Sequence, residues 1–216
     1  MPVTAGEIIT DARDLHPAFD GTRNPDGVLR RALRRAHADL WGRVMVIEPD
    51  VIRDETAIQA LPLGNFAAGF IMPDPFVRIL GGRVFANLDE LPLSLVPQHQ
   101  RFAPSRFPAA FEQFGTVYLV GSEADWTDYT GFSVEFVPQA PTAFASNATL
   151  IQLPDDAQPA LVHALGAFMA NRTEDAPNAA PIDRRQFRQD ADAERDRFLE
   201  RIGHRKVVVA QIPELW

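Results

Sequence analysis

The 216-residue sequence contains no cysteine. Disulfides, thiol nucleophiles and cysteine-based zinc sites are therefore excluded, and the absence fits a reducing compartment. Long apolar runs are also missing, since no stretch approaches the roughly 18 residues of a membrane span. The first residues, 1–7, have neither a basic patch nor the apolar core of a secretory signal. We therefore expect neither a membrane protein nor a secreted precursor.

Short catalytic and nucleotide-binding motifs are absent as well. The sequence has no Gly-rich phosphate loop, H-E-x-x-H, G-x-S-x-G or EF-hand pattern. Its histidines are scattered over different predicted elements, which does not favour metal ligation; they are His16, His37, His99, His163 and His204. We predict no catalytic residue, no metal site and no cofactor, and we expect that the protein is not an enzyme.

The composition is that of a folded protein with an uneven charge. Hydrophobic residues make up 46% of the chain and charged residues 23%, which permits a sizeable core. The net charge is −8, and it lies in the middle, where residues 53–182 hold fourteen acidic and six basic side chains. Such a surface disfavours gripping nucleic acid through its phosphates, but it suits a wall past which DNA slides.

Two helices are predicted before residue 44. Thr4 and Glu7 form a capping box that opens a helix to about His16. The apolar stripe of this helix consists of Ile8, Ile9, Ala12 and Leu15. Asn24 as N-cap and Pro25 at the first helical position predict a second helix, which we expect to end near Gly42.

The region 44–150 is rich in short β-type runs separated by proline and glycine. The pair Gly81-Gly82 predicts the turn of a two-residue hairpin. The segment from Leu91 to Phe111 contains four prolines and is expected to be a long extended loop. The predicted strands are Val44–Ile47, Val51–Arg53, Ala57–Leu61, Phe76–Leu80, Arg83–Ala86, Thr116–Val120 and Phe132–Val137.

Helical patterns return near the end of the chain. One helix is predicted from Asp155 to about Asn171, with Leu161, Leu165, Phe168 and three alanines on its packing face. A capping box of Asp183 and Gln186 opens another helix, which Gly203 is expected to close. The inward side chains of that helix are Phe187, Ala191, Phe198 and Ile202.

These elements predict an α+β fold in which a four-helix bundle is interrupted by a β-rich sandwich or sheet insert and followed by a strand-like tail. The predicted divisions are 1–43 for the two N-terminal helices, 44–150 for the insert, 151–205 for the two C-terminal helices and 206–216 for the tail.

The tail is apolar enough to require cover. Its segment Lys206 to Ile212 is predicted to be a strand, and leaving its large side chains in water would forfeit several kcal/mol. The residues in question are Val207, Val208, Val209, Ile212, Leu215 and Trp216. Either the tail adds a strand to the insert of its own chain, or it reaches a neighbouring subunit or partner by strand addition.

A double arginine ladder is the second candidate interface. Arg30, Arg31, Arg34 and Arg35 stand at i, i+4 spacing on the second predicted helix. The ladder is either a solvated face or a contact for a negatively charged neighbour, such as the acidic insert of another copy.

An acidic cluster with two aromatic residues, 125–129, could pair Asp125 and Asp128 for acid and base chemistry on a sugar. A turn between the strands around Thr116 and Phe132 explains the same residues, and we favour that interpretation.

The order of these elements resembles that of tailed-bacteriophage head–tail connector, or adaptor, proteins. The resemblance covers residues 4–203 and consists of four features in a fixed order. A short capped helix is followed by a helix that begins with Arg-Asn-Pro-Asp-Gly. The insert then ends with Val-Glu-Phe-Val-Pro-Gln-Ala-Pro, and Leu-Pro-Asp-Asp-Ala precedes the next helix. The size of the insert is similar to that in adaptor and tubular tail proteins with a β-rich insert.

The resemblance implies a structural virion protein, made in the host cytoplasm and located at the head–tail interface. Its expected partners are further copies of itself in a ring of about 12, the portal, tail-completion proteins and passing DNA, with no membrane. Such a ring extends the DNA channel and provides the attachment point for the tail. The alternatives are a small carbohydrate-active or hydrolytic enzyme using Asp125 and Asp128, or a soluble binding module for virion assembly.

Overall fold

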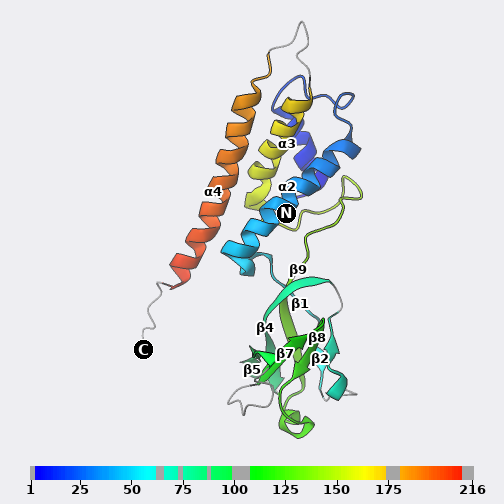
Figure 1. The fold of residues 1–216 in the computed structure, drawn as a ribbon, viewed down its shortest axis with the longest axis vertical. Coiled ribbons are helices and arrows are strands. Elements are labelled where there is room, and N and C mark those ends of the chain that lie inside the picture. Colours follow the sequence, from blue (N-terminus) through cyan, green and yellow to red (C-terminus); the bar gives the residue numbers. More distant parts are fainter. Residues whose placement is uncertain are drawn as a thin grey trace. The chain divides into compact units, whose positions relative to one another are not determined.

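A computed structural model shows a mixed α+β protein (Figure 1). It describes residues 3–61, 66–72, 75–86, 89–98, 108–173 and 181–210. The chain divides into two compact units, which are described separately below. The helical unit comprises residues 1–52 and 140–216, and the β unit comprises residues 53–139.

Helix α1 (Ala5–Asp14) forms as its sequence predicts. The Thr4 hydroxyl accepts a hydrogen bond from the Glu7 backbone N–H, and the Glu7 carboxylate accepts one from the Thr4 N–H. The Thr4 backbone N–H and then its hydroxyl hold the pKa of Glu7 below its usual value. Ile8, Ile9 and Ala12 are buried, so the capping box and the apolar stripe are both confirmed.

Helix α2 (Asp26–Ile47) begins where expected but is capped differently. Asn24 is not its N-cap, because the side chain is fully buried and donates to the Thr173 hydroxyl at 3.3 Å. The helix also continues past Gly42 to Ile47, so the strand expected at Val44–Ile47 is wrong. Val44 is fully buried and extends the same apolar stripe by one turn, so that helical packing decides the conformation here.

Helix α3 (Gln158–Arg172) follows a 3₁₀ turn at Asp155–Ala157, close to the predicted start. Leu161 and Leu165 are buried as expected, whereas Met169 rather than Phe168 completes the buried face. Gly166 lies against α1, since a Cβ there would stand 2.6 Å from Leu15 Cδ1. This close approach explains a glycine in the middle of a helix.

Helix α4 (Arg184–Ala210) packs against α3, with Phe198 and Ile202 fully buried. The Asp183 carboxylate accepts from the backbone N–H groups of Arg185 and Gln186, which confirms Asp183 as the cap. The Gln186 side chain donates to Asp190 at 2.7 Å, so only this half of the predicted capping box is seen.

The end of α4 corrects two expectations. Gly203 does not close the helix, and Val207, Val208 and Val209 are helical rather than in a strand. A glycine costs a helix only about 1 kcal/mol relative to alanine, and it ends a helix only where its φ turns positive. Ile212, Leu215 and Trp216 lie outside the described residues, so their predicted role as an interface stays a prediction.

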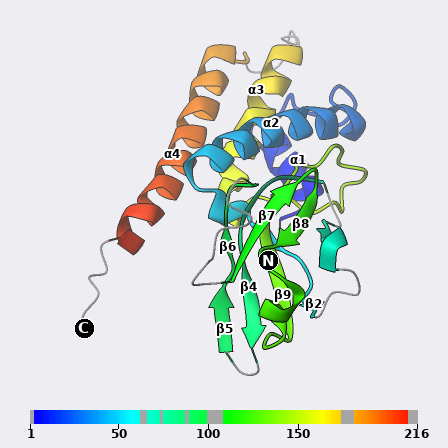
Figure 2. The same cartoon turned by 60° about the horizontal axis from the view of Figure 1, so that its bottom comes forward.

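The described residues of the β unit form two sheets (Figure 2). The first has the order β1-β9-β4-β5, with β2 also paired to β9, and is antiparallel throughout. Its strands are β1 (Asp54–Glu55), β2 (Gln59–Ala60), β4 (Phe76–Ala86), β5 (Asp89–Pro92) and β9 (Gly131–Pro138). The second has the order β3-β8-β7-β6, with only the β6–β7 pair parallel among its described strands. Its strands are β3 (Phe70–Ile71), β6 (Ser94–Leu95), β7 (Ala109–Gln113) and β8 (Thr116–Leu119).

The predicted hairpin at Gly81-Gly82 is wrong. Residues 76–86 form one continuous strand, β4, along which both glycines pair with β9. A Cβ at Gly82 would stand 2.3 Å from the Ser133 backbone oxygen. The glycine therefore permits a close approach of two strands, and a register shift between Ile79 and Gly81 marks the irregularity.

Of the other predicted strands, some are confirmed and one is wrong. The strands at Thr116–Val120 and Phe132–Val137 are confirmed as β8 and β9, and Ala57–Leu61 contains the short β2. The strand at Val51–Arg53 is wrong, because Pro49–Ile52 forms a 3₁₀ helix. The expected loop from Leu91 to Phe111 holds β6 and parts of β5 and β7, although residues 99–107 lie outside the described part.

Candidate interaction surfaces

Two of the four arginines in the ladder are hydrogen-bonded within the helical unit, and the other two are exposed. Arg30 donates to Asn147 Oδ1 at 3.0 Å, and Arg34 donates to the Thr142 carbonyl at 3.1 Å. This half of the ladder fixes the returning segment 140–150 onto α2. Arg31 and Arg35 are exposed, and they form the half that is available to a partner.

Asn147 connects α1, α2 and the returning segment, a role that the sequence analysis missed. Its Nδ2 donates to Asp26 Oδ2 at 2.6 Å, and its backbone carbonyl accepts from the Gly6 N–H at 2.8 Å. Arg13 donates to Asp26 Oδ1 at 2.5 Å. The hydrogen bonds from Asn147 and then from Arg13 hold the pKa of Asp26 below its usual value. No local pattern reveals this junction, since its members are far apart in the chain.

The acidic cluster 125–129 lies in the 3₁₀ helix Glu123–Trp126 and the turn that follows it, between β8 and β9. The Asp125 carboxylate accepts from the Ser122 backbone N–H and hydroxyl at 2.7 and 2.8 Å, and these two bonds lower its pKa. Trp126 is buried and donates from Nε1 to the Val120 carbonyl at 2.9 Å. Asp128 is exposed on the next turn. Asp125 and Trp126 thus stabilise the local fold, as the favoured interpretation predicted.

A second charged cluster crosses the first sheet. Arg83 on β4 donates to Glu55 on β1 and to Glu90 on β5, the latter at 3.3 Å. The fully buried Ser133 hydroxyl also donates to Glu55. Burial by itself would raise the pKa of Glu55, but the bonds from Ser133 and Arg83 outweigh it and the pKa is lowered. These cross-strand contacts join the four strands β1, β9, β4 and β5.

His37 is the most perturbed titratable side chain among those described. It is 1% exposed, stacks on Trp41 with ring centroids 5.5 Å apart, and meets the edge of Phe144 at 5.4 Å. Burial lowers its pKa to about 4, so the ring is neutral near pH 7. Within the described part of the chain, neither His37 nor any other histidine belongs to a group of three or more candidate metal ligands.

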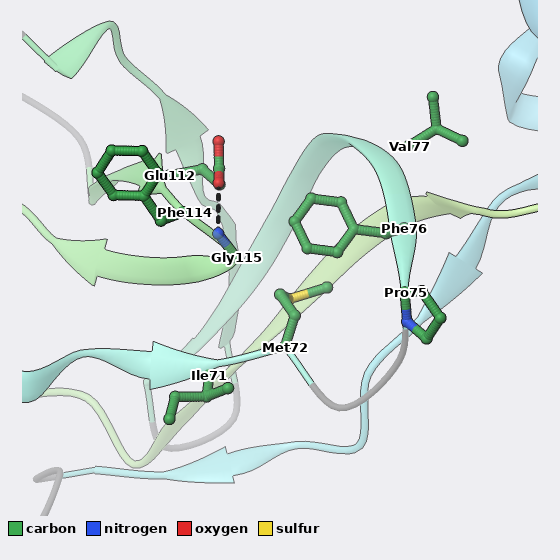
Figure 3. A pocket seen from close by; sticks show the side chains of 8 residues that line it. All are labelled: Ile71, Met72, Pro75, Phe76, Val77, Glu112, Phe114 and Gly115. Carbon is green, nitrogen blue, oxygen red and sulfur yellow. Dashed lines mark hydrogen bonds between the residues drawn. The ribbon is translucent and has the colours of Figure 1, made fainter.

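An open pocket of about 550 Å³ lies in the β unit (Figure 3). It is formed by β3, the start of β4 and the β7–β8 turn, and Figure 3 shows Met72 and the ring of Phe76 facing the space beside that turn. Most of its lining residues have apolar side chains, and Glu112 is the charged one. The Glu112 carboxylate accepts from the Gly115 N–H at 2.8 Å. The lining residues are Ile71, Met72, Pro75, Phe76, Val77, Glu112, Phe114 and Gly115.

The β7–β8 turn at the rim of this pocket is unusual. Phe114 and Gly115 are its two central residues, with φ of 53° and 79°. Positive φ at both positions defines a type I′ hairpin turn, whose first position normally holds asparagine, aspartate or glycine. A phenylalanine there is both conformationally disfavoured and, at 94%, almost fully exposed. The Phe-Gly pair between two β-type runs was the available sequence signal for this turn.

Comparison with known proteins does not assign the chain to a family. No protein-family model matches it, and a search of curated proteins finds no match. Among the described helices, none combines the length and the apolar character needed to cross a bilayer.

Proposed function

We propose that the protein is a structural component of a tailed-bacteriophage virion, which forms a ring between portal and tail and extends the DNA channel. The observation that carries the proposal is the order of the elements. Two helices precede the β unit, two follow it, and both pairs belong to one helical unit. This order supports the proposal, because the sequence resemblance implies two helices on each side of a β-rich insert.

Two surface features support assembly with copies of the same chain. The β unit, residues 53–139, contains ten acidic and five basic side chains, whereas α2 presents Arg31 and Arg35 to solvent. Surfaces of opposite sign on one chain suit a head-to-tail contact between copies, which closes into a ring when the rotation permits.

The proposal is tested by adding the purified full chain to portal rings of a tailed phage and measuring the mass of the complex by mass photometry and electron microscopy. We expect about 12 copies on each portal in a symmetric ring, because cyclic assembly repeats one interface. A chain that remains monomeric at all concentrations and does not bind portal would contradict the proposal.

The arginine ladder supplies a matched pair of variants. Arg31→Glu with Arg35→Glu should reduce ring assembly at least about tenfold, because the exposed half of the ladder would then repel the acidic β unit. Arg185→Glu with Arg188→Glu makes the same charge change at two exposed positions of α4 and should assemble normally. Equal losses in both variants would show that net charge, rather than the ladder, controls assembly.

A further inference from the structure

Exposed apolar side chains gather around the pocket of the β unit. Phe114 is 94% exposed, Ile71 is 74% exposed and Val77 is 47% exposed, and all three line it. Single exposed apolar residues are common on soluble proteins, but several around one concavity are typical of an interaction site.

The disfavoured backbone conformation of Phe114 is not offset by burial of its side chain. Its ring is outside the core, and its φ of 53° is one that side chains other than glycine, asparagine and aspartate rarely adopt. Backbone strain of this kind persists mainly where it contributes to function. The exposed ring belongs to a residue that lines the pocket, so it is accessible to a second molecule.

The chain itself contains an occupant of suitable size and chemistry. Residues 211–216, Gln-Ile-Pro-Glu-Leu-Trp, follow α4 and include three large apolar side chains in six residues. A pocket of about 550 Å³ falls in the range of sites that take a small ligand or a pair of side chains. Arg205 and Lys206, near the end of α4, are basic and favour the approach of this end of the helix to the acidic β unit of another copy, while the segment itself carries the single acidic side chain Glu214.

We propose that residues 211–216 of one copy dock into the pocket of a second copy, with Leu215 and Trp216 as apolar anchors beside Phe114. Each copy then donates one segment and accepts another, which is a head-to-tail contact that can close a ring. This inference rests on the proposed ring function and gives that function a specific subunit contact.

The absence of cysteine makes a site-specific test possible in the full-length chain. One chain carries Ile71→Cys at the pocket, and a second chain with a size tag carries Glu214→Cys between the apolar residues of the segment. After mixing and mild oxidation, we expect a disulfide-linked heterodimer at least about tenfold more abundant than random collision gives, because docking raises the effective concentration of the two thiols.

The control pairs Glu214→Cys with Ile58→Cys. Ile58 is also exposed in the β unit, but it does not line the pocket. Equal crosslinking at positions 58 and 71 would overturn the inference. A chain that carries both Ile71→Cys and Glu214→Cys and forms only an internal disulfide would also overturn it, because docking would then occur within one copy.

Phe114→Asn in the Ile71→Cys chain provides a second readout. Asparagine suits the turn, so the β unit should stay folded while crosslinking falls to the level of the control. Crosslinking unaffected by this change would exclude Phe114 from the contact. If rings form on the portal but no crosslink is found, the docking contact is wrong and the proposed function stands. If the copies crosslink but do not bind portal, the proposed function is wrong and the docking contact stands.

Discussion

The helical unit and the β unit differ in how well each covers its own apolar side chains. Seven large apolar side chains among the described residues are exposed, and only Val46 and Leu150 of these belong to the helical unit. The other five belong to the β unit, which is much the smaller of the two. They are Ile58, Ile71, Val77, Leu91 and Phe114.

The difference teaches where each unit obtains its stability. The helical unit buries apolar side chains from each of its helices, including Leu33, Leu161 and Phe198. The β unit has its own core around Val84, Phe132 and Val134, and cross-strand contacts such as that between Glu55 and Arg83 add to it. Small cores leave sheet edges and turns uncovered, which are common places for partners to bind.

The largest expected effect concerns the close approach of β4 and β9. Gly82→Ala should destabilise the β unit by about 3 kcal/mol or more, because the new Cβ would clash with the Ser133 carbonyl. Urea unfolding followed by a probe in the β unit measures this loss.

Gly81→Ala is the matched control for that change, since a Cβ at Gly81 would meet only the Leu93 carbonyl at 3.9 Å. The control should cost less than about 1 kcal/mol. Similar losses at both glycines would contradict the importance given to the contact between Gly82 and the Ser133 carbonyl.

The stability of the helical unit should depend on pH through the buried His37. The pKa of His37 is lowered from 6.5 to about 4 on folding, so the unfolded chain binds the proton more readily. Stability is therefore complete above pH 6.5 and falls between pH 6.5 and 4, by at most about 3 kcal/mol. Denaturant unfolding of the helical unit as a function of pH measures this slope.

His37→Phe should flatten the slope, while His204→Gln at an exposed position of α4 should leave it unchanged. A slope that persists in the His37 variant would assign the effect to other groups.

Removing charged side chains from the first sheet should reduce the stability of the β unit by less than Gly82→Ala does. Glu55→Ala removes the acceptor of the buried Ser133 hydroxyl and the main partner of Arg83, and we expect a loss of about 1–3 kcal/mol in the β unit. Thermal unfolding measures it. Glu90→Ala, on the exposed side of Arg83, should cost less than about 1 kcal/mol. A reversed order would contradict the importance given to Ser133.

The smallest predicted effect is a gain in stability rather than a loss. Phe114→Asn should stabilise the β unit by about 0.5–1 kcal/mol, because asparagine tolerates the positive φ of the turn and Phe114 buries almost nothing. Chemical denaturation of the isolated monomer measures the gain. Loss of stability would show that Phe114 supports its own fold.

The helices could be predicted better than the sheets. Thr4 and Asp183 cap α1 and α4 as their spacing predicts, because capping is a contact between residues three positions apart. The ends of α2 and α4 were missed, since neither Gly42 nor Gly203 stops a helix that neighbouring packing supports.

The candidate interfaces were predictable only in part. The ladder from Arg30 to Arg35 is visible at i, i+4 spacing, but its division into a bound and an exposed half depends on Thr142 and Asn147, more than a hundred residues later. The pocket around Phe114 was missed because its lining comes from three separate strands and a turn.

The sequence by itself determined the helix starts, the apolar stripes and the mixed α+β class, because these depend on neighbours within one or two turns. Only the tertiary structure decided that Gly82 lies within a strand and that the exposed ring of Phe114 stands at the rim of a pocket. Those outcomes depend on pairings between distant segments, such as β4 with β9, and no local pattern specifies which distant backbone will approach.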